Sequence, residues 1–196
     1  LAGTVYSMQG AHTDLGGAPS GLALRVSLDG PYRIGAWALD GFACRGNLPG
    51  NTWCRAPTFL PGQLLIEAVV DHVAEATGLS ADAVRLRNVY AAGDATIYNQ
   101  ILTRCTLERC IAEARARAGY DELARAVRAR NSAQRFVKEG LALSPFKYGM
   151  GAATGHRALV RVHADGSVRV QQAGVESGQG LRVKQAQAAA RALGCD

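Results

Sequence analysis

The clearest pattern of apolar and polar positions along the chain predicts a helix that begins near Pro61 and ends at Gly78. Apolar side chains recur over this stretch at the spacing of one helix face. The recurring positions are Leu65, Ala68, Val69, His72, Val73 and Ala76. Proline suits the first turn of a helix and glycine its end. Because His72 falls on the apolar stripe, we expect a core histidine there rather than a metal ligand.

Weaker patterns predict further elements on both sides of this helix. Ser80 and Thr106 each stand where a helix N-cap is favoured. After residue 140 the period changes from helical to alternating, and Asp165-Gly166 is a strong hairpin turn. The predicted elements are a strand over 1–8, helices over 80–87, 106–118, 120–135 and 181–193, and a hairpin with strands around 158–163 and 167–172. The segment 95–104 has no strong period, so we place a subdomain boundary near residue 100.

The composition mainly excludes some classes of protein. Of the 196 residues, 48% are apolar and 19% are charged, which allows a packed core. The net charge is +6, but the arginines are scattered among acidic residues, without a Lys/Arg block or interleaved aromatics. We therefore expect no nucleic-acid partner, although a basic binding module would be revealed by salt-dependent association. The chain has no hydrophobic run long enough to span a bilayer, so we expect no membrane partner.

The cysteines and histidines form no metal-binding pattern. The five cysteines include no C-x-x-C pair, and the four histidines have no ligand spacing. We assign no metal ligand and predict a reducing, cytoplasmic location. The chain begins at Leu1 without an initiator methionine. We expect it to be a piece of a longer protein, or a gene model that lost its neighbours.

A glycine-rich loop between a predicted strand and a predicted helix carries the first candidate chemistry. Its residues are Gly174-Val175-Glu176-Ser177-Gly178-Gln179-Gly180. Such a turn lets a ligand approach the backbone closely, and the unpaired N–H groups and the dipole of the helix favour an anionic group there. The spacing matches neither the G-x-G-x-x-G of a dinucleotide fold nor a P-loop. Taken alone, the loop favours the simpler interpretation of a tight strand–helix connection.

A second candidate loop lies far upstream and leads into the helix near Pro61. It runs Cys44-Arg45-Gly46-Asn47-Leu48-Pro49-Gly50-Asn51-Thr52-Trp53-Cys54-Arg55-Ala56-Pro57. Arg55 stands close to the helix start, and a guanidinium group suits fork-like binding of phosphate or carboxylate. The alternative is a surface arginine paired with a nearby acid.

Together these segments resemble the molybdenum-cofactor domain of the xanthine dehydrogenase and aldehyde oxidase family. In that family a run like Cys-Arg-x-Asn-Leu-Pro-x-Asn-Thr-x-x-Arg precedes a long helix, and a run like Gly-x-Glu-x-Gly-Gln-Gly-Leu follows a hairpin. Between them lies a segment like Arg87-Asn88-Val89-Tyr90-Ala91-Ala92-Gly93-Asp94, followed by Tyr98-Asn99-Gln100. All three motifs occur here in the family's order. The resemblance covers nearly the whole chain, more thinly before Phe42.

The resemblance implies a mixed α/β (α+β) fold, with helices packed on mixed sheets in a partial molybdopterin-binding domain. Residues 1–100 would be the C-terminal part of the first molybdopterin-binding subdomain, and residues 101–196 the N-terminal part of the second. Arg55 would lie beside the molybdenum centre. Gln179, with Gly178 and Gly180, would contact the pterin dithiolene or its phosphate, and Glu176 would brace the loop.

The implied function is that of a molybdenum-dependent hydroxylase, an oxidoreductase acting on small molecules such as aldehydes or N-heterocycles. Molybdopterin would be the cofactor of this chain. FAD and 2Fe-2S clusters would belong to parts of the full protein outside it, and that protein would be a homodimer. The family's general base, a glutamate in a Gly-Glu-Pro-like motif, has no counterpart here. We therefore assign no catalytic residue and expect the isolated chain to be inactive.

Three positions favour the aldehyde oxidase side of the family over the purine-oxidising side. Pro57 holds the place of a substrate-stacking phenylalanine, and we assign it to the substrate pocket. Ala23 and a position at or near Ala152 hold the places of an arginine and a second aromatic residue. Alternatively, the chain is a truncated or decayed copy that has the same fold but no catalytic activity, and it acts as a scaffold.

Overall fold

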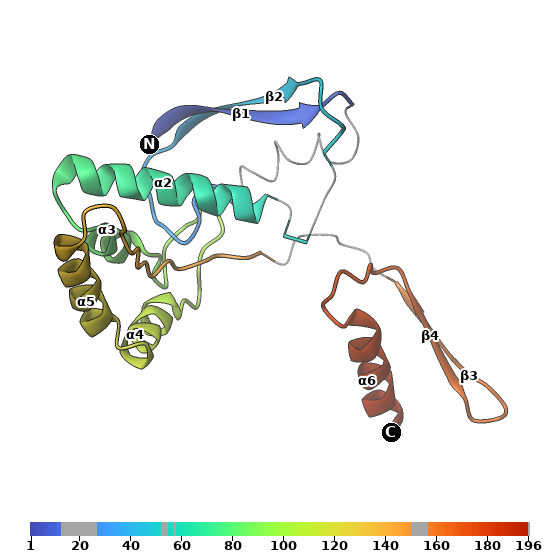
Figure 1. Ribbon diagram of the computed structural model, residues 1–196. Coiled ribbons are helices and arrows are strands. Elements are labelled where there is room, and N and C mark those ends of the chain that lie inside the picture. Colours follow the sequence, from blue (N-terminus) through green and yellow to red (C-terminus); the bar gives the residue numbers. More distant parts are fainter. Residues whose placement is uncertain (13–26, 52–54, 57, 150–156, 196) are drawn as a thin grey trace. The chain divides into compact units, whose positions relative to one another are not determined.

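The computed structural model describes residues 1–12, 27–51, 55–56, 58–149 and 157–195. The chain divides into two compact units, unit 1 over Leu1–Gly149 and unit 2 over Met150–Asp196. Both contain helices and small sheets (Figure 1), which confirms the expected mixed α/β fold. None of the described helices combines the length and the apolar character needed to cross a membrane.

The described residues of unit 1 form a two-stranded parallel sheet and four helices (Figure 1). The strands are β1 (Ala2–Gly10) and β2 (Ala38–Arg45), and the helices are α2 (Phe59–Thr77), α3 (Ala81–Asn88), α4 (Leu107–Arg117) and α5 (Tyr120–Ala133). The predicted strand over 1–8 is confirmed as β1. The sequence did not predict β2, whose ALDGFACR segment lacks a regular apolar alternation. It pairs in parallel with β1 from Ala2↔Ala38 onward, a contact that local periodicity does not report.

Helix α2 confirms the strongest prediction, and Gly78 ends it in the left-handed conformation with φ 70°. The predicted buried face is nevertheless wrong. The helix buries Ile66, Val70 and Ala74, whereas Leu65 and Val73 remain 38% and 42% exposed. The buried stripe is set by the partners on one side of the helix, because Ile66, Val70 and Ala74 join Tyr32 and Val84 in the main core cluster.

The prediction of a core histidine is also wrong. His72 is exposed, and its Nδ1 lies 2.8 Å from the carbonyl oxygen of Ala68, one helical turn earlier. The shift of the buried stripe explains this outcome, since His72 shares the helix face that the core leaves uncovered.

The helix caps follow the sequence in one case and depart from it in another. The Ser80 hydroxyl accepts a hydrogen bond from the Ala83 amide at 3.2 Å, as an N-cap should. Thr106 precedes α4 but makes no side-chain cap bond. Gly119, at φ 57°, separates α4 from α5, and that left-handed conformation suits glycine.

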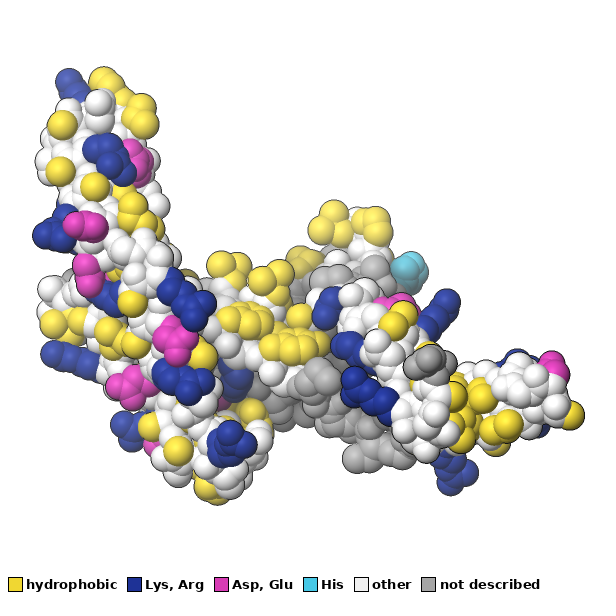
Figure 2. Space-filling model, turned by 90° about the horizontal axis from the view of Figure 1, so that it is seen from below, with side chains coloured by type: hydrophobic (Ala, Val, Ile, Leu, Met, Phe, Trp, Pro, Cys, Tyr) yellow, Lys and Arg dark blue, Asp and Glu magenta, His cyan; other side chains and the backbone are white. Residues whose placement is uncertain are grey.

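Unit 2 consists of a hairpin followed by a helix. The hairpin joins β3 (Ala158–Val162) to β4 (Val168–Gln172), and α6 spans Leu181–Leu193. The turn is the predicted one: Gly166 has φ 82°, and Asp165 Oδ1 accepts from the Ser167 amide at 2.9 Å. Helix α6 contains no buried residue. Figure 2 shows yellow hydrophobic side chains along the hairpin at the right, and Val160 and Val162 are 46% and 63% exposed.

Candidate cofactor-binding loops

The glycine loop of unit 2 is organised around the carboxylate of Glu176. Its Oε1 accepts from the amides of Gly178 at 2.8 Å and Gly180 at 3.0 Å, and its Oε2 accepts from the Leu181 amide at 2.6 Å. Gly178 and Gly180 have φ values of 89° and 69°, a left-handed conformation that suits glycine. Glu176 thus braces the loop, as the sequence resemblance implied, and fills the anion-binding end of α6 itself.

The electrostatics agree with this geometry. Desolvation acts to raise the pKa of Glu176, but the backbone N–H donors of Gly180, Leu181, Gly178 and Arg182 outweigh it and lower the pKa below its ordinary value. The carboxylate is therefore held in its charged form, which is the form that accepts all of these bonds.

Gln179 is also held within the loop. Its Oε1 accepts from the Ser177 amide at 2.6 Å, and its Nε2 donates to the Val175 carbonyl at 2.7 Å. A ligand that uses the side-chain amide of Gln179 must therefore exchange these bonds for its own. Gly180 is open on its outer side, because a Cβ placed there would meet no atom within 4 Å. A ligand can therefore approach Gly180 closely on that side, although the Gly180 amide itself donates to Glu176.

The upstream loop places Arg55 at an irregular turn between β2 and α2. Ala56 and Thr58, which flank Pro57, have φ values of 64° and 70°. Such conformations are uncommon for residues other than glycine and tend to cluster at functional sites. Arg55 is exposed and forms no ion pair or hydrogen bond with another described residue. The alternative of a surface arginine paired with an acid is therefore not what the described residues show.

Two buried polar atoms lie just beyond Arg55 without a partner among the described residues. They are Oγ1 of Thr58 and Oε1 of Gln63, whose residues are 8% and 9% exposed. An unsatisfied buried polar atom is costly and calls for an explanation such as a ligand or water. Sequence reasoning did not single out either atom, because burial and the lack of a partner are visible only in three dimensions.

These observations fit a polar, anionic group such as a pterin phosphate in chemical terms. The fit comes from the Arg55 guanidinium, which has no partner among the described residues, and from the strained turn and orphaned polar atoms beside it. The Arg55 turn lies in unit 1 and the Gln179 loop in unit 2. Their convergence on one cavity stays a prediction. Pro57, Ala23 and Ala152 lie outside the described residues, so the substrate-pocket assignments also stay predictions.

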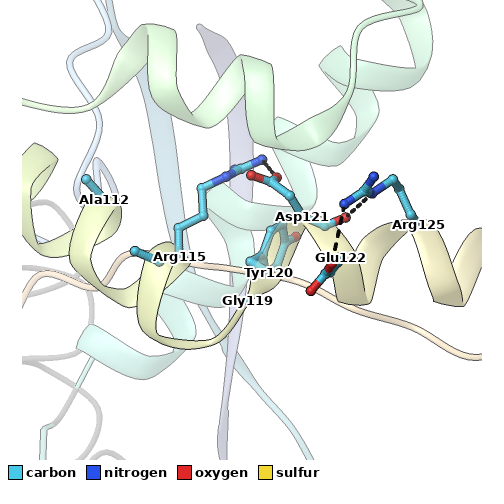
Figure 3. A pocket seen from close by; sticks show the side chains of 8 residues that line it. Ala112, Arg115, Gly119, Tyr120, Asp121, Glu122 and Arg125 are labelled. Carbon is cyan, nitrogen blue, oxygen red and sulfur yellow. Dashed lines mark hydrogen bonds and ion pairs between the residues drawn. The ribbon is translucent and has the colours of Figure 1, made fainter.

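A separate hollow of about 430 Å³ lies at the turn between α4 and α5 (Figure 3). Its arginines are already paired with acids. Arg115 forms an ion pair with Asp121, and Arg125 lies 3.9 Å from Glu122. Figure 2 shows the same pattern at larger scale, with dark blue basic side chains interspersed with magenta acidic ones on the left, over the helical part of unit 1. The hollow is therefore a weaker candidate for an anionic ligand than Arg55.

Comparison with known proteins decides the family. Two models described as "Molybdopterin cofactor-binding domain" match residues 1–89 and 113–196. Xanthine dehydrogenase from Drosophila pseudoobscura pseudoobscura is 38% identical over 167 residues, which cover 83% of this chain and 12% of that protein. Aldehyde oxidase 1 from Macaca fascicularis is 37% identical over 173 residues, covering 86% and 13%. The chain belongs to the xanthine dehydrogenase and aldehyde oxidase family.

Similar solved structures support the fold. Quinoline 2-oxidoreductase from Pseudomonas putida 86 matches with a TM-score of 0.70 and 21% identity, covering 97% of this chain and 26% of that one. The aldehyde oxidoreductase from Desulfovibrio desulfuricans matches with a TM-score of 0.67 and 24% identity, covering 87% and 19%. The expected molybdopterin cofactor is confirmed at the level of the family, because both matched models describe domains that bind it.

The comparisons leave two finer expectations as predictions. The interval between the two matched segments, 90–112, contains the predicted subdomain boundary near residue 100, but no finding tests that boundary. Xanthine dehydrogenases and aldehyde oxidases match with similar identities, so the preference for the aldehyde oxidase side also stays a prediction. The chain spans about an eighth of the length of these two relatives.

Proposed function

We propose that this chain supplies part of the molybdopterin-binding site of an oxidoreductase that oxidises small molecules, namely aldehydes or N-heterocycles. The observation that carries the proposal is the unpaired Arg55 at its strained turn, inside a segment matched by the cofactor-binding family. The second loop lies inside the other matched segment. The relatives named aldehyde oxidase and xanthine dehydrogenase support the substrate class.

Within the proposed site, Arg55, Gly178, Gln179 and Gly180 hold the cofactor, and Pro57 contributes to the substrate pocket. Arg55 binds an anionic or accepting group. The Gly178 and Gly180 amides donate to Glu176, so these glycines contribute by letting the cofactor approach the loop closely without a Cβ in the way. Glu176 keeps the loop in the required conformation. When bound, the molybdenum centre supplies the two-electron oxidation of the substrate carbon.

The whole protein carries functions that this chain does not. We propose that 2Fe-2S clusters and FAD in other parts of the full-length protein accept the electrons, and that the full-length protein is a cytoplasmic homodimer. No residue of this chain is assigned as the general base. The isolated chain is therefore expected to bind the pterin without turnover. In the full-length enzyme, Pro57→Phe and Ala23→Arg should shift the substrate preference from aldehydes toward purines.

The test is to express the chain in cells that make the molybdenum cofactor and to measure its pterin content after oxidation to a fluorescent product. Arg55→Ala and Gln179→Ala should each retain several-fold less pterin than the unaltered chain. Arg117→Ala is the matched control, because Arg117 is exposed and its ion pair is a surface contact with Glu113 at 3.5 Å. Equal pterin in all variants, or none in the unaltered chain, contradicts the proposal and favours a non-catalytic scaffold. Turnover of an aldehyde by the isolated chain contradicts its expected inactivity.

A further inference from the structure

A buried ion pair joins two parts of unit 1 that lie 118 residues apart in sequence. The Asp29 side chain is 0% exposed, and its Oδ1 pairs with Nζ of Lys147, whose side chain is 19% exposed. The second carboxylate oxygen, Oδ2, accepts from the Tyr90 hydroxyl at 2.7 Å. The Lys147 ammonium also lies 5.8 Å and 5.1 Å from the ring centroids of Tyr90 and Tyr98, within reach of cation–π attraction. Both oxygens of Asp29 are thus paired.

Lys147 belongs to a short segment, residues 145–149, which we call the strap. The strap lies on the first turns of α2. The Pro145 carbonyl accepts from Nε2 of Gln63 at 2.8 Å. The Tyr148 ring packs edge-on against Phe59, with centroids 5.1 Å apart. A Cβ on Gly149 would lie 3.0 Å from Cζ of Phe59, so the backbone approaches the ring closely.

The strap therefore lies next to the Arg55 turn. Phe59 opens α2, and its amide donates to the Ala56 carbonyl at 3.2 Å. Gln63, which holds the strap through its Nε2, is also the residue whose Oε1 is buried without a described partner. One side of the candidate site is thus built from residues 55–56 and 58–63, and the strap covers the beginning of α2.

The chemistry of the pair indicates why Lys147 matters to the strap. Burial raises the pKa of Asp29 and lowers the pKa of Lys147, while each group's charge favours the charged form of the other. Both groups are largely buried, so removing one partner leaves the charge of the other buried without compensation, which is unfavourable. Without the pair, the contacts between the strap and α2 that remain among the described residues are the Pro145 hydrogen bond and the packing on Phe59.

We propose that Asp29 and Lys147 are positioning residues, whose ion pair clasps the strap onto the start of α2 and so fixes the Arg55 turn for the cofactor. The last clause rests on the function proposed above. In this proposal the pair acts on the site through the strap's contacts with Phe59 and Gln63.

The first test measures amide hydrogen exchange in the full chain. Lys147→Met keeps the aliphatic stem and removes the charge. It should speed exchange of the Phe59 and Gly62 amides, which lie under the strap and donate to the Ala56 and Thr58 carbonyls, by at least about tenfold, as expected when one partner of a buried pair is lost. The second half of α2 and all of α3 should stay within about twofold. Lys147→Arg should partly restore protection. The double variant Asp29→Asn/Lys147→Met should be closer to the unaltered chain than Lys147→Met, because no buried charge is left unpaired.

Lys138→Met is the matched control, because Lys138 is exposed and bonds only to the backbone carbonyls of Asn131 and Gln134 among the described residues. It should leave exchange of the two amides under the strap unchanged. A uniform rise in exchange over α2 and α3 in Lys147→Met overturns the proposal, since the pair would then stabilise the whole unit. No change at the two amides under the strap overturns it as well.

The second test asks whether the clasp serves the site. Pterin content should fall several-fold in Lys147→Met and stay unchanged in Lys138→Met. Normal pterin content in a chain with a released strap overturns the positioning claim and leaves the proposed function standing, provided that Arg55→Ala still loses pterin. If Arg55→Ala also retains pterin, the proposed function itself has failed.

Discussion

The two compact units differ in what holds their candidate loops in place. Unit 1 supports the Arg55 turn with a buried cluster that includes Tyr32, Ile66 and Val84 and with ion pairs that reach across the sequence. Unit 2 supports the Gln179 loop with local hydrogen bonds, and its helix α6 buries no residue. Burial therefore positions the first loop, whereas backbone-to-carboxylate bonds within a few residues position the second.

This difference has an energetic consequence. A two-stranded hairpin is marginal on its own in water, and the apolar side chains of β3 and β4 stay largely exposed. Substitutions in unit 1 should therefore change the free energy of unfolding, whereas substitutions in unit 2 should change local order.

Arg85→Met should have the largest effect on unit 1. Arg85 is 6% exposed; its Nε donates to Glu67 Oε2 at 2.7 Å, and its Nη2 lies 2.9 Å from Asp71 Oδ1. Removing the guanidinium leaves the carboxylate of Glu67 partly buried without its cation, which should cost about 4 kcal/mol of unfolding free energy. Urea denaturation of the full chain measures it. Arg125→Met, exposed on α5, should change stability by less than about 0.5 kcal/mol; similar losses for both would break the contrast.

Ile66→Ala should come next. Ile66 is 1% exposed in the core, so the truncation loses apolar burial and leaves a cavity, at a cost of about 3 kcal/mol. Leu64→Ala, on the exposed face of the same helix at 71% exposure, is the control and should cost less than about 0.5 kcal/mol. Denaturant midpoints compare the two. A larger loss for Leu64 would mean that the described core is not the one that stabilises α2.

Gly174→Ala should disturb unit 2 locally. A Cβ on Gly174 would lie 2.6 Å from both Oε1 of Gln172 and Cδ2 of Leu181, so the loop must shift, at a cost of about 2 kcal/mol. Amide exchange should rise in β4 and α6 and stay constant in α2. Gly140→Ala is the control, because a Cβ there meets nothing within 4 Å. Increased exchange in α2 would show that the units are energetically coupled.

Ser80→Ala should cost about 1 kcal/mol, because it removes the acceptor for the Ala83 amide at the start of α3. Thr106→Ala is the matched control, since Thr106 makes no side-chain cap bond to α4, and its effect should be smaller. Thermal or urea unfolding measures both. Equal effects would indicate that the two hydroxyls act through something other than capping.

Acidification should act on the Gln179 loop first. The pKa of Glu176 is lowered in the fold, so its stabilising contribution is fully present above the ordinary value of 4.5 and is lost as the pH falls below that value through the lowered one. Amide protection of Gly178, Gly180 and Leu181 should decline together below about pH 4.5. Glu176→Gln should lack this decline. Retention of the pH dependence in that variant would assign it to another group.

Local patterns predicted most elements but not which surfaces they bury. The apolar period placed α2, and Ser80 and Asp165-Gly166 marked a cap and a turn that the structure confirms. The same period assigned the wrong face of α2. Leu65 and Val73 are apolar, but Tyr32 and Val84 pack against the neighbouring stripe of the helix, which carries Ile66, Val70 and Ala74. His72 was misjudged for the same reason. Strand β2 was missed since its pairing with β1 is a contact between distant residues.

The sequence alone determined the family, the glycine loop and the positions of most helices and turns. Those features depend on residues close together in the chain, or on motifs that can be matched in order. The tertiary structure decided that Ile66, Val70 and Ala74 form the buried face of α2, that β2 pairs with β1, and that Asp29 meets Lys147. Such facts arise from which distant side chains share a buried volume, and burial is a property of the folded chain rather than of any short stretch of it.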